Sequence, residues 1–154
     1  MKNNLGFTFA ELVIVMGIMV ILMMIVSVNF FPIKQKASLS TTVQSLISDI
    51  KLEQLKSMSG ESSQGVYFEP SNKNYIVFRG LTYDVANTTN FTIPLGDQII
   101  VYTIDYSGRQ LIFSSGSGEI GNFSPGNKIV LHNTVSNEEK TIFFNKYGTV
   151  ISVE

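Results

Sequence analysis

The 154-residue chain contains no cysteine, no tryptophan and one histidine, His132. The lack of cysteine excludes disulfides, thiolate metal sites and a cysteine nucleophile. A histidine metal site needs partner ligands, and no second histidine exists to supply one. His132 is therefore predicted to be a structural or surface residue. No metal, no cofactor and no catalytic residue is expected.

Charge is also scarce, because charged residues make up 15% of the chain and the formal net charge is −1. Beyond Gly60 there are nine acidic residues against six lysines and arginines. A nucleic-acid-binding protein needs cations that release phosphate counterions. This balance argues against nucleic acid as a partner.

Familiar catalytic and ligand-binding patterns are missing. The glycines of Gly116-Ser117-Gly118 lack the helix and the lysine of a phosphate-binding loop, and they predict a turn. Asp97 and Asp105 lack the dense carboxylate spacing of a calcium loop. Serine and threonine are abundant but have no general base in a recognisable motif. The sequence does not predict an enzyme.

The strongest positive signal is an apolar run from Leu12 to Val26, fifteen residues without a charge or a side-chain hydrogen-bonding group. As a helix, residues 7–31 would extend about 37 Å, enough to cross a hydrocarbon core of about 30 Å with some tilt. No small-residue cleavage site follows Val26, so the run is expected to stay in the mature chain as a transmembrane helix. The short leader before it favours a cytoplasmic N-terminus and an exported C-terminal domain.

Glu11 is unexpected at the start of such a helix. A carboxylate in a membrane helix costs about 2.5–3.5 kcal/mol and requires a partner. Cleavage after Gly6 would create a new α-amino group on Phe7, four residues before Glu11. The dipole of the helix partly offsets the cost in the first turn. A salt bridge from Glu11 to the Phe7 amine of a neighbouring subunit would set the register between helices.

The segment Gly6-Phe7-Thr8-Phe9-Ala10-Glu11, followed by the apolar run, resembles the class III signal of type IV prepilins and pseudopilins. The resemblance implies that a prepilin peptidase cleaves between Gly6 and Phe7 and methylates the Phe7 amine. It makes Glu11 the residue of the assembly salt bridge. Phe9 stands where the family usually has leucine. The implied partners are the peptidase, other pilin subunits, an inner-membrane assembly platform and membrane lipid.

Residues 32–59 predict an amphipathic continuation of the helix. Pro32 is expected to end or kink the apolar part, because proline removes a backbone donor and clashes with the preceding turn. Gly60 is the predicted stop. The apolar stripe expected to pack on a sheet comprises Leu39, Val43, Leu46, Ile47 and Ile50.

Residues 60–154 predict a β-rich globular domain. Residues 66–68 and 75–78 flank a five-residue turn and predict a hairpin, and residues 83–90 predict a loop. Further strands are expected at residues 98–104, 110–113, 128–132, 140–144 and 149–153. The predicted fold class is α+β, with a long N-terminal helix packed on a mainly antiparallel sheet.

This order of elements, which ends in a closing hairpin, resembles the GspH/FimT domain of minor pseudopilins and minor pilins. Some FimT-like minor pilins bind DNA through basic residues near the C-terminus. Residues 147–154 contain no lysine or arginine and end in an acid, so DNA binding is not carried over.

The functional prediction is a non-catalytic structural subunit of a type IV pilus or type II secretion-like filament. It would be a single-pass protein of the cytoplasmic (inner) membrane before assembly, and part of the pilus or pseudopilus afterwards. A minor subunit is favoured, and a major subunit that forms the shaft stays open. So does an adhesin or DNA-uptake receptor, which would need a cationic or aromatic surface on residues 83–90 and 114–125. Whether secretion, adhesion and twitching, or DNA uptake is served is also open.

Overall fold

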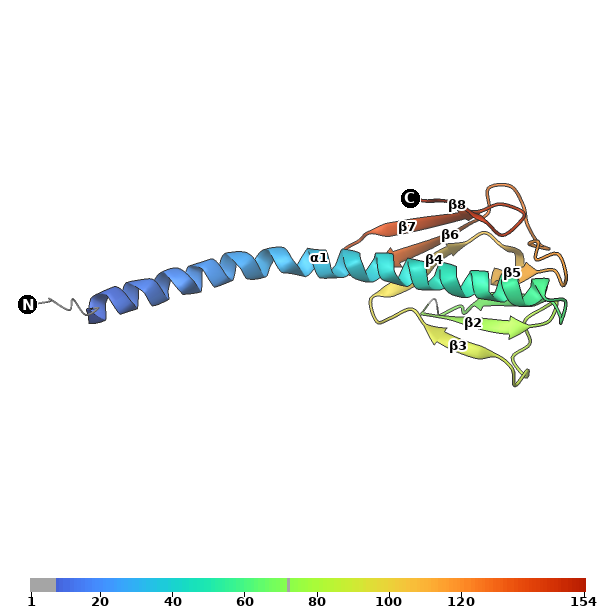
Figure 1. Cartoon of the computed structure of the whole chain (residues 1–154), viewed down its shortest axis with the longest axis horizontal. Helices are drawn as coiled ribbons and strands as arrows, with labels where there is room; N and C mark the ends of the chain where they lie inside the picture. The colour runs from blue at the N-terminus through green and yellow to red at the C-terminus, as the bar shows by residue number, and fades with distance from the viewer. Residues whose placement is uncertain (1–7, 72) are drawn as a thin grey trace, which may run out of the picture. The chain divides into compact units, whose positions relative to one another are not determined.

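The computed structural model describes residues 8–71 and 73–154, without the side chains of residues 25–38. The chain divides into two compact units, Met1–Lys34 and Gln35–Glu154, and each is described by itself. One helix, α1 (Phe9–Met58), begins in the first unit and ends in the second (Figure 1). Within the described residues, no stretch of helix combines the length and the apolarity that crossing a membrane requires. The predicted span of residues 7–31 overlaps undescribed residues and stays a prediction.

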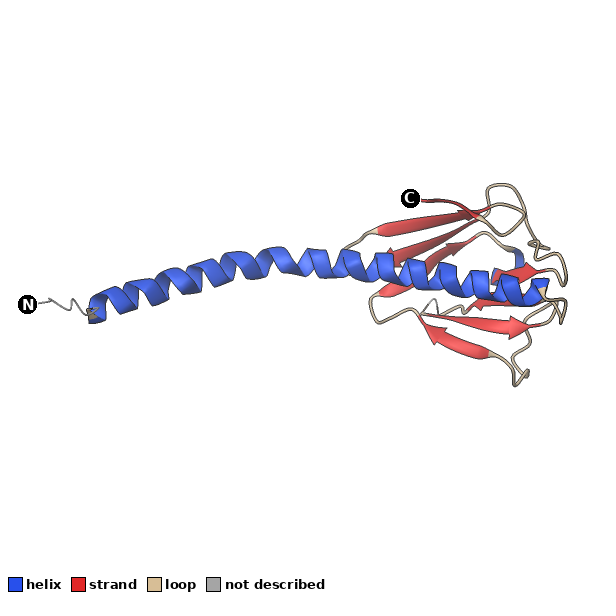
Figure 2. Cartoon of the chain, viewed as in Figure 1, coloured by secondary structure: helices blue, strands red, loops and turns tan. Residues whose placement is uncertain are grey.

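The second unit, called the globular unit below, combines the C-terminal part of α1 with two sheets (Figure 2). One sheet has the strand order β3-β2-β1-β5 and the other β4-β6-β7-β8. Every pairing between neighbouring strands is antiparallel. The predicted α+β class and antiparallel pairing are therefore confirmed. The strands are β1 (Gln64–Phe68), β2 (Asn74–Arg79), β3 (Phe91–Pro94), β4 (Ile99–Ile104), β5 (Gln110–Phe113), β6 (Lys128–Asn133), β7 (Glu139–Phe144) and β8 (Val150–Val153).

A single hydrophobic core joins α1 to both sheets. All five residues of the predicted helical stripe are buried, and Leu46 and Ile50 have no exposed surface at all. Alternate residues of the strands face them, because side chains point to opposite faces of a sheet with a period of two. The sheet residues of the core include Val66, Phe68, Leu111 and Phe113 from one sheet and Ile129, Leu131, Ile142 and Phe144 from the other.

The end of α1 is fixed by its own turn and by two loops. Gly60 adopts a φ of 85°, which an L-residue rarely does, and the helix stops two residues earlier as predicted. The Gln54 amide donates to the backbone oxygens of Gly118 and Tyr147. Ser57 O accepts the N–H of Gly116 at 2.8 Å. The last turn of the helix is thereby bonded to loops from both sheets.

The expected hairpin and loop are confirmed, but strand β3 was missed. β1 pairs with β2 in register from Gln64↔Arg79 to Phe68↔Tyr75, and residues 83–90 contain no helix or strand. β3 has only four residues, ends at Pro94 and is largely exposed, so its apolar pattern is too short to predict a strand. It pairs with β2 from Asn74↔Pro94 to Val77↔Phe91, and its Ile93 packs against the hydrophobic core.

Replacing Gly148 by alanine is expected to destabilise the globular unit by about 3 kcal/mol, the sum of backbone strain and overpacking. Gly148 has a φ of 72°. A Cβ there would lie 2.5 Å from the Gln54 Nε2 atom and 2.9 Å from the Phe113 ring. Gly126→Ala is the matched control, because its φ is 86° with no atom within 4 Å of the added Cβ. If the two variants lowered the thermal unfolding temperature equally, overpacking at Gly148 would be contradicted.

Tyr106 should make the fold sensitive to alkali. Burial, aided by the Asp105 charge, raises the pKa of Tyr106 from 10.0 to about 12. Between those two pH values the unfolded state ionises first, so stability falls as pH rises through that window. Tyr106→Phe should shift the alkaline unfolding midpoint upward, whereas Tyr102→Phe, on an exposed ring, should not. An unchanged midpoint for Tyr106→Phe would count against the burial effect.

Candidate functional site

Glu11 lies in the first turn of α1 and is held there by Thr8. The Thr8 backbone N–H and the Thr8 hydroxyl both donate to Glu11 Oε2 at 2.9 Å. In return, the Glu11 N–H donates to Thr8 Oγ1 at 3.3 Å. This reciprocal arrangement is a capping box, in which two otherwise unpaired donors at a helix start are satisfied. Within the described residues both bonds to the carboxylate fall on Oε2, which leaves Oε1 to accept a further donor.

The structure says less about the other predicted site residues. Gly6 and Phe7 lie outside the described residues. Pro32 lies inside α1, so the alternative in which the helix ends there is wrong. The side chain of Pro32 is not described, and the predicted kink stays a prediction. The structure thus brings Glu11 together with Thr8, a residue to which the sequence had given no role.

The large apolar side chains near Glu11 are exposed in the part of the first unit that the structure describes. The large apolar residues from Phe9 to Met24 range in exposure from 49% for Leu12 to 83% for Phe9. Glu11 is the one ionisable residue among them. Exposed apolar surfaces of this extent mark contacts with protein or lipid. Residues Phe9–Met24 therefore carry an extended apolar surface that the described residues leave exposed.

His132 lies on β6, next to Glu139 of β7 and Tyr102 of β4. His132 Nδ1 is 3.3 Å from Glu139 Oε1, within ion-pair range, but within the described residues Nδ1 forms no hydrogen bond. The Tyr102 and His132 rings lie 5.8 Å apart. His132 is a partly exposed member of a sheet face.

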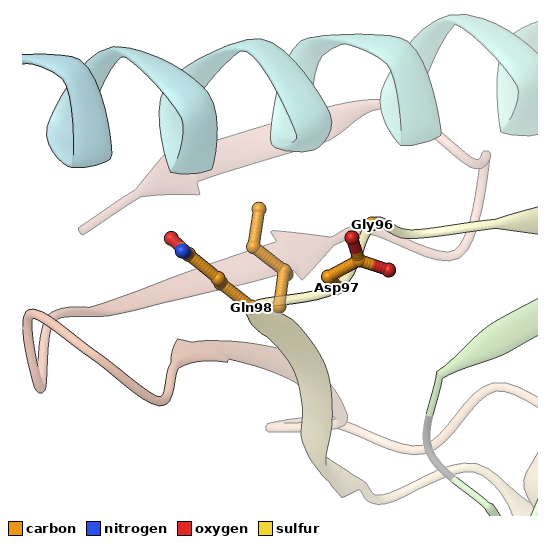
Figure 3. A pocket seen from close by; sticks show the side chains of 4 residues that line it. Gly96, Asp97 and Gln98 are labelled. Atoms are coloured by element: carbon orange, nitrogen blue, oxygen red, sulfur yellow. The ribbon is translucent and has the colours of Figure 1, made fainter.

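The remaining sequence candidates stay apart from one another. Gly116 and Gly118 belong to the predicted turn, and a Cβ added at Gly118 would lie 2.4 Å from Met58 Cγ at the end of α1. Figure 3 shows the side chains of Asp97 and Gln98 at a pocket of about 180 Å³, which Gly96 and Ile99 also line. Asp105 does not line this pocket. Within the residues that the structure describes, no three His, Asp or Glu side chains gather in a way that could hold a metal ion.

A groove that the sequence did not predict lies between α1 and strands β2 and β3. It has a volume of about 220 Å³ and is called the α1–β3 groove. Its walls are mainly apolar, and its lining residues are Asp49, Leu52, Glu53, Lys56, Val77, Phe91 and Ile93.

The charged groups of the α1–β3 groove are already engaged within the fold. Asp49 accepts a hydrogen bond from the Tyr75 hydroxyl, and burial, aided by this bond, raises the pKa of Tyr75. Glu53 is 3% exposed, and its Oε1 accepts from Lys56 Nζ at 2.7 Å. What the groove offers to another molecule is therefore chiefly its apolar wall.

Comparison of the chain with protein-family models, with curated proteins and with solved structures gives no match. Functional inference therefore depends on the residues themselves. The sequence prediction overlooked the capping box, although Thr8-x-x-Glu11 has the residue spacing typical of one. The α1–β3 groove had none, since it depends on the register of a strand that the pattern did not predict.

Thr8→Val keeps the branched side chain but removes the hydroxyl of the capping box. We expect a loss of about 1 kcal/mol in the local stability of the first turn. Amide hydrogen exchange of Glu11 in the detergent-solubilised chain measures this loss. Amides beyond the first turns of α1 should exchange as before. Loss of protection along the whole helix would argue against a local capping role.

Proposed function

We propose that the chain is a minor pilin or pseudopilin, a non-catalytic structural subunit of a type IV pilus or a type II secretion-like filament. The observation that supports this most directly is the exposed apolar part of α1, which begins with one carboxylate held in a capping box. Such a helix suits insertion in lipid first and packing among similar helices afterwards. The globular unit would stay outside the cytoplasm.

The capping box gives Glu11 a defined role before assembly. A carboxylate without partners would cost several kcal/mol in lipid. The two bonds from Thr8 lower that cost in the single subunit and leave Oε1 as an acceptor. After cleavage between Gly6 and Phe7, the charged amine of a neighbouring Phe7 is the donor that completes the site. A buried pair of this kind favours one axial register, because any other register leaves both charges unpaired.

The major pilin is the alternative within the same class, and it uses the same residues. The two differ in copy number, since a major subunit forms the shaft and a minor one starts or caps it. Stoichiometry in purified filaments separates them. Neither version assigns the chain to secretion, adhesion or DNA uptake.

The test of the proposed function is Glu11→Ala in the full chain. We expect leader cleavage to proceed, because the peptidase site lies at Gly6 and Phe7. Incorporation into the filament fraction should fall, because the neighbouring amine loses its counter-charge. Mass spectrometry of the N-terminus measures cleavage and methylation, and immunoblotting of sheared filaments measures incorporation.

Glu61→Ala is the control, because Glu61 is an exposed acid outside α1. It should leave both readouts unchanged. Normal incorporation of Glu11→Ala would contradict the proposed role of Glu11 in filament assembly. A mature chain that begins at Met1, or that lacks the whole apolar segment, would rule out the prepilin assignment itself.

A further inference from the structure

Three segments of the globular unit match Asn-x-Ser/Thr, the acceptor sequence of N-linked glycosylation. They are Asn87-Thr88-Thr89, Asn90-Phe91-Thr92 and Asn122-Phe123-Ser124. The matches carry little weight by themselves, because the unit is rich in asparagine, serine and threonine and such spacings arise by chance. Glycosylation forms a bond to the amide nitrogen of the asparagine. The three segments therefore differ according to what each amide nitrogen already bonds.

The Asn122 amide is a bridge within the fold. Its nitrogen Nδ2 donates to Gln110 O at 2.6 Å and to Ser107 O at 3.5 Å. Its oxygen Oδ1 accepts the Ile112 N–H at 3.3 Å. Both N–H groups of the amide are therefore engaged, and a sugar on this nitrogen would displace one of them. The loss would loosen the attachment of Asn122 to strand β5, so Asn122 is a structural residue.

The Asn90 segment is held at both of its ends. Asn90 Nδ2 donates to Asp84 O at 2.7 Å, and Asn90 Oδ1 is buried. The threonine of this segment, Thr92, belongs to strand β3 and pairs with Ile76 of β2. A transferase must bind the asparagine and the threonine together. It could therefore bind residues 90–92 only by separating the start of β3 from its partner strand.

The Asn87 amide nitrogen is much less engaged. Its contact with Arg79 O is 3.4 Å long, beyond the usual range of an N–H···O bond. Asn87 Oδ1 accepts the backbone N–H of Thr89 at 3.0 Å and the Thr89 hydroxyl at 2.8 Å. This Asx turn brings the amide and the hydroxyl of the acceptor sequence together. Thr88 and Thr89 are both exposed, so the segment is accessible without unfolding.

The loop that contains Asn87 also exposes apolar side chains. Residues 81–90 connect β2 to β3, and Figure 1 shows this loop projecting past the ends of the two strands. Leu81 is 75% exposed and Val85 is 83% exposed. A glycan is bulky and strongly hydrated, and it raises the solubility of the surface that carries it. A sugar on Asn87 would therefore lie on a loop whose apolar side chains are otherwise open to water.

We propose that Asn87 is the acceptor of an N-linked glycan and that Asn90 and Asn122 are not. The donor is a sugar linked through a diphosphate to a membrane lipid. Asn87 Nδ2 forms a bond to the anomeric carbon of the sugar, and the bond from that carbon to the diphosphate breaks. The lipid diphosphate leaves, and a proton of Nδ2 passes to a base of the transferase. This inference rests on the proposed function, which exports the globular unit through the membrane that holds the donor.

Tandem mass spectrometry of the full chain, recovered from the membranes of its native cells, tests the assignment. Fragmentation that preserves glycans should place a sugar on Asn87 and none on Asn90 or Asn122. Thr89→Val should lose the sugar completely, whereas Thr89→Ser should retain it. Thr88→Val is the matched control, because Thr88 is equally exposed but is the free middle position of the sequence, and it should keep the sugar. A sugar on Asn90 or Asn122, or one that persists in Thr89→Val, overturns the proposal.

N-terminal mass spectrometry of the same samples separates this inference from the proposed function. A chain that begins at Phe7 and has an unmodified Asn87 refutes the acceptor assignment alone. A chain that begins at Met1 and carries the sugar on Asn87 refutes the prepilin assignment alone. A chain that begins at Met1 and carries no sugar refutes both.

Discussion

The globular unit depends on the apolar stripe of α1 that is buried against both sheets. Leu39, Val43, Leu46 and Ile50 lie within the same core as the inner faces of the two sheets. Burial of a large aliphatic side chain contributes about 1.5–3 kcal/mol, so the stripe accounts for a large part of what holds two separate sheets to one helix. Without it, two four-stranded sheets would each leave an apolar face in water.

One helix therefore carries two different patterns of apolar residues. In the globular unit, apolar residues recur on one face and polar ones on the other, as a helix at a protein surface requires. From Phe9 to Met24 the apolar residues surround the helix and are all exposed. A helix that is apolar on every side is suited to lipid or to a bundle of like helices. The capping box at Thr8 and Glu11 marks the point where this segment begins.

The elements with a strong periodic signal could be predicted from the sequence. The stripe of α1, the β1–β2 hairpin and strand β5 follow from period and turn chemistry alone. β3 could not be predicted, because its four residues are stabilised by pairing with β2 rather than by their own pattern. The same holds for the α1–β3 groove, which depends on the register between neighbouring strands. Glu11 could be singled out because it is a carboxylate at the start of an apolar run. Its partner Thr8 could have been found only from the residue spacing of a capping box.

The bonds between the last turn of α1 and the two loops have a mechanical consequence. Gln54 and Ser57 connect the helix to the backbones of residues 116–118 and of Tyr147. Traction applied along the helix therefore reaches the loop after β5 and the C-terminal hairpin together, rather than peeling one strand at a time. Because several bonds loaded in parallel must break at once, the unit resists such a force better than the same bonds would if they were loaded in series.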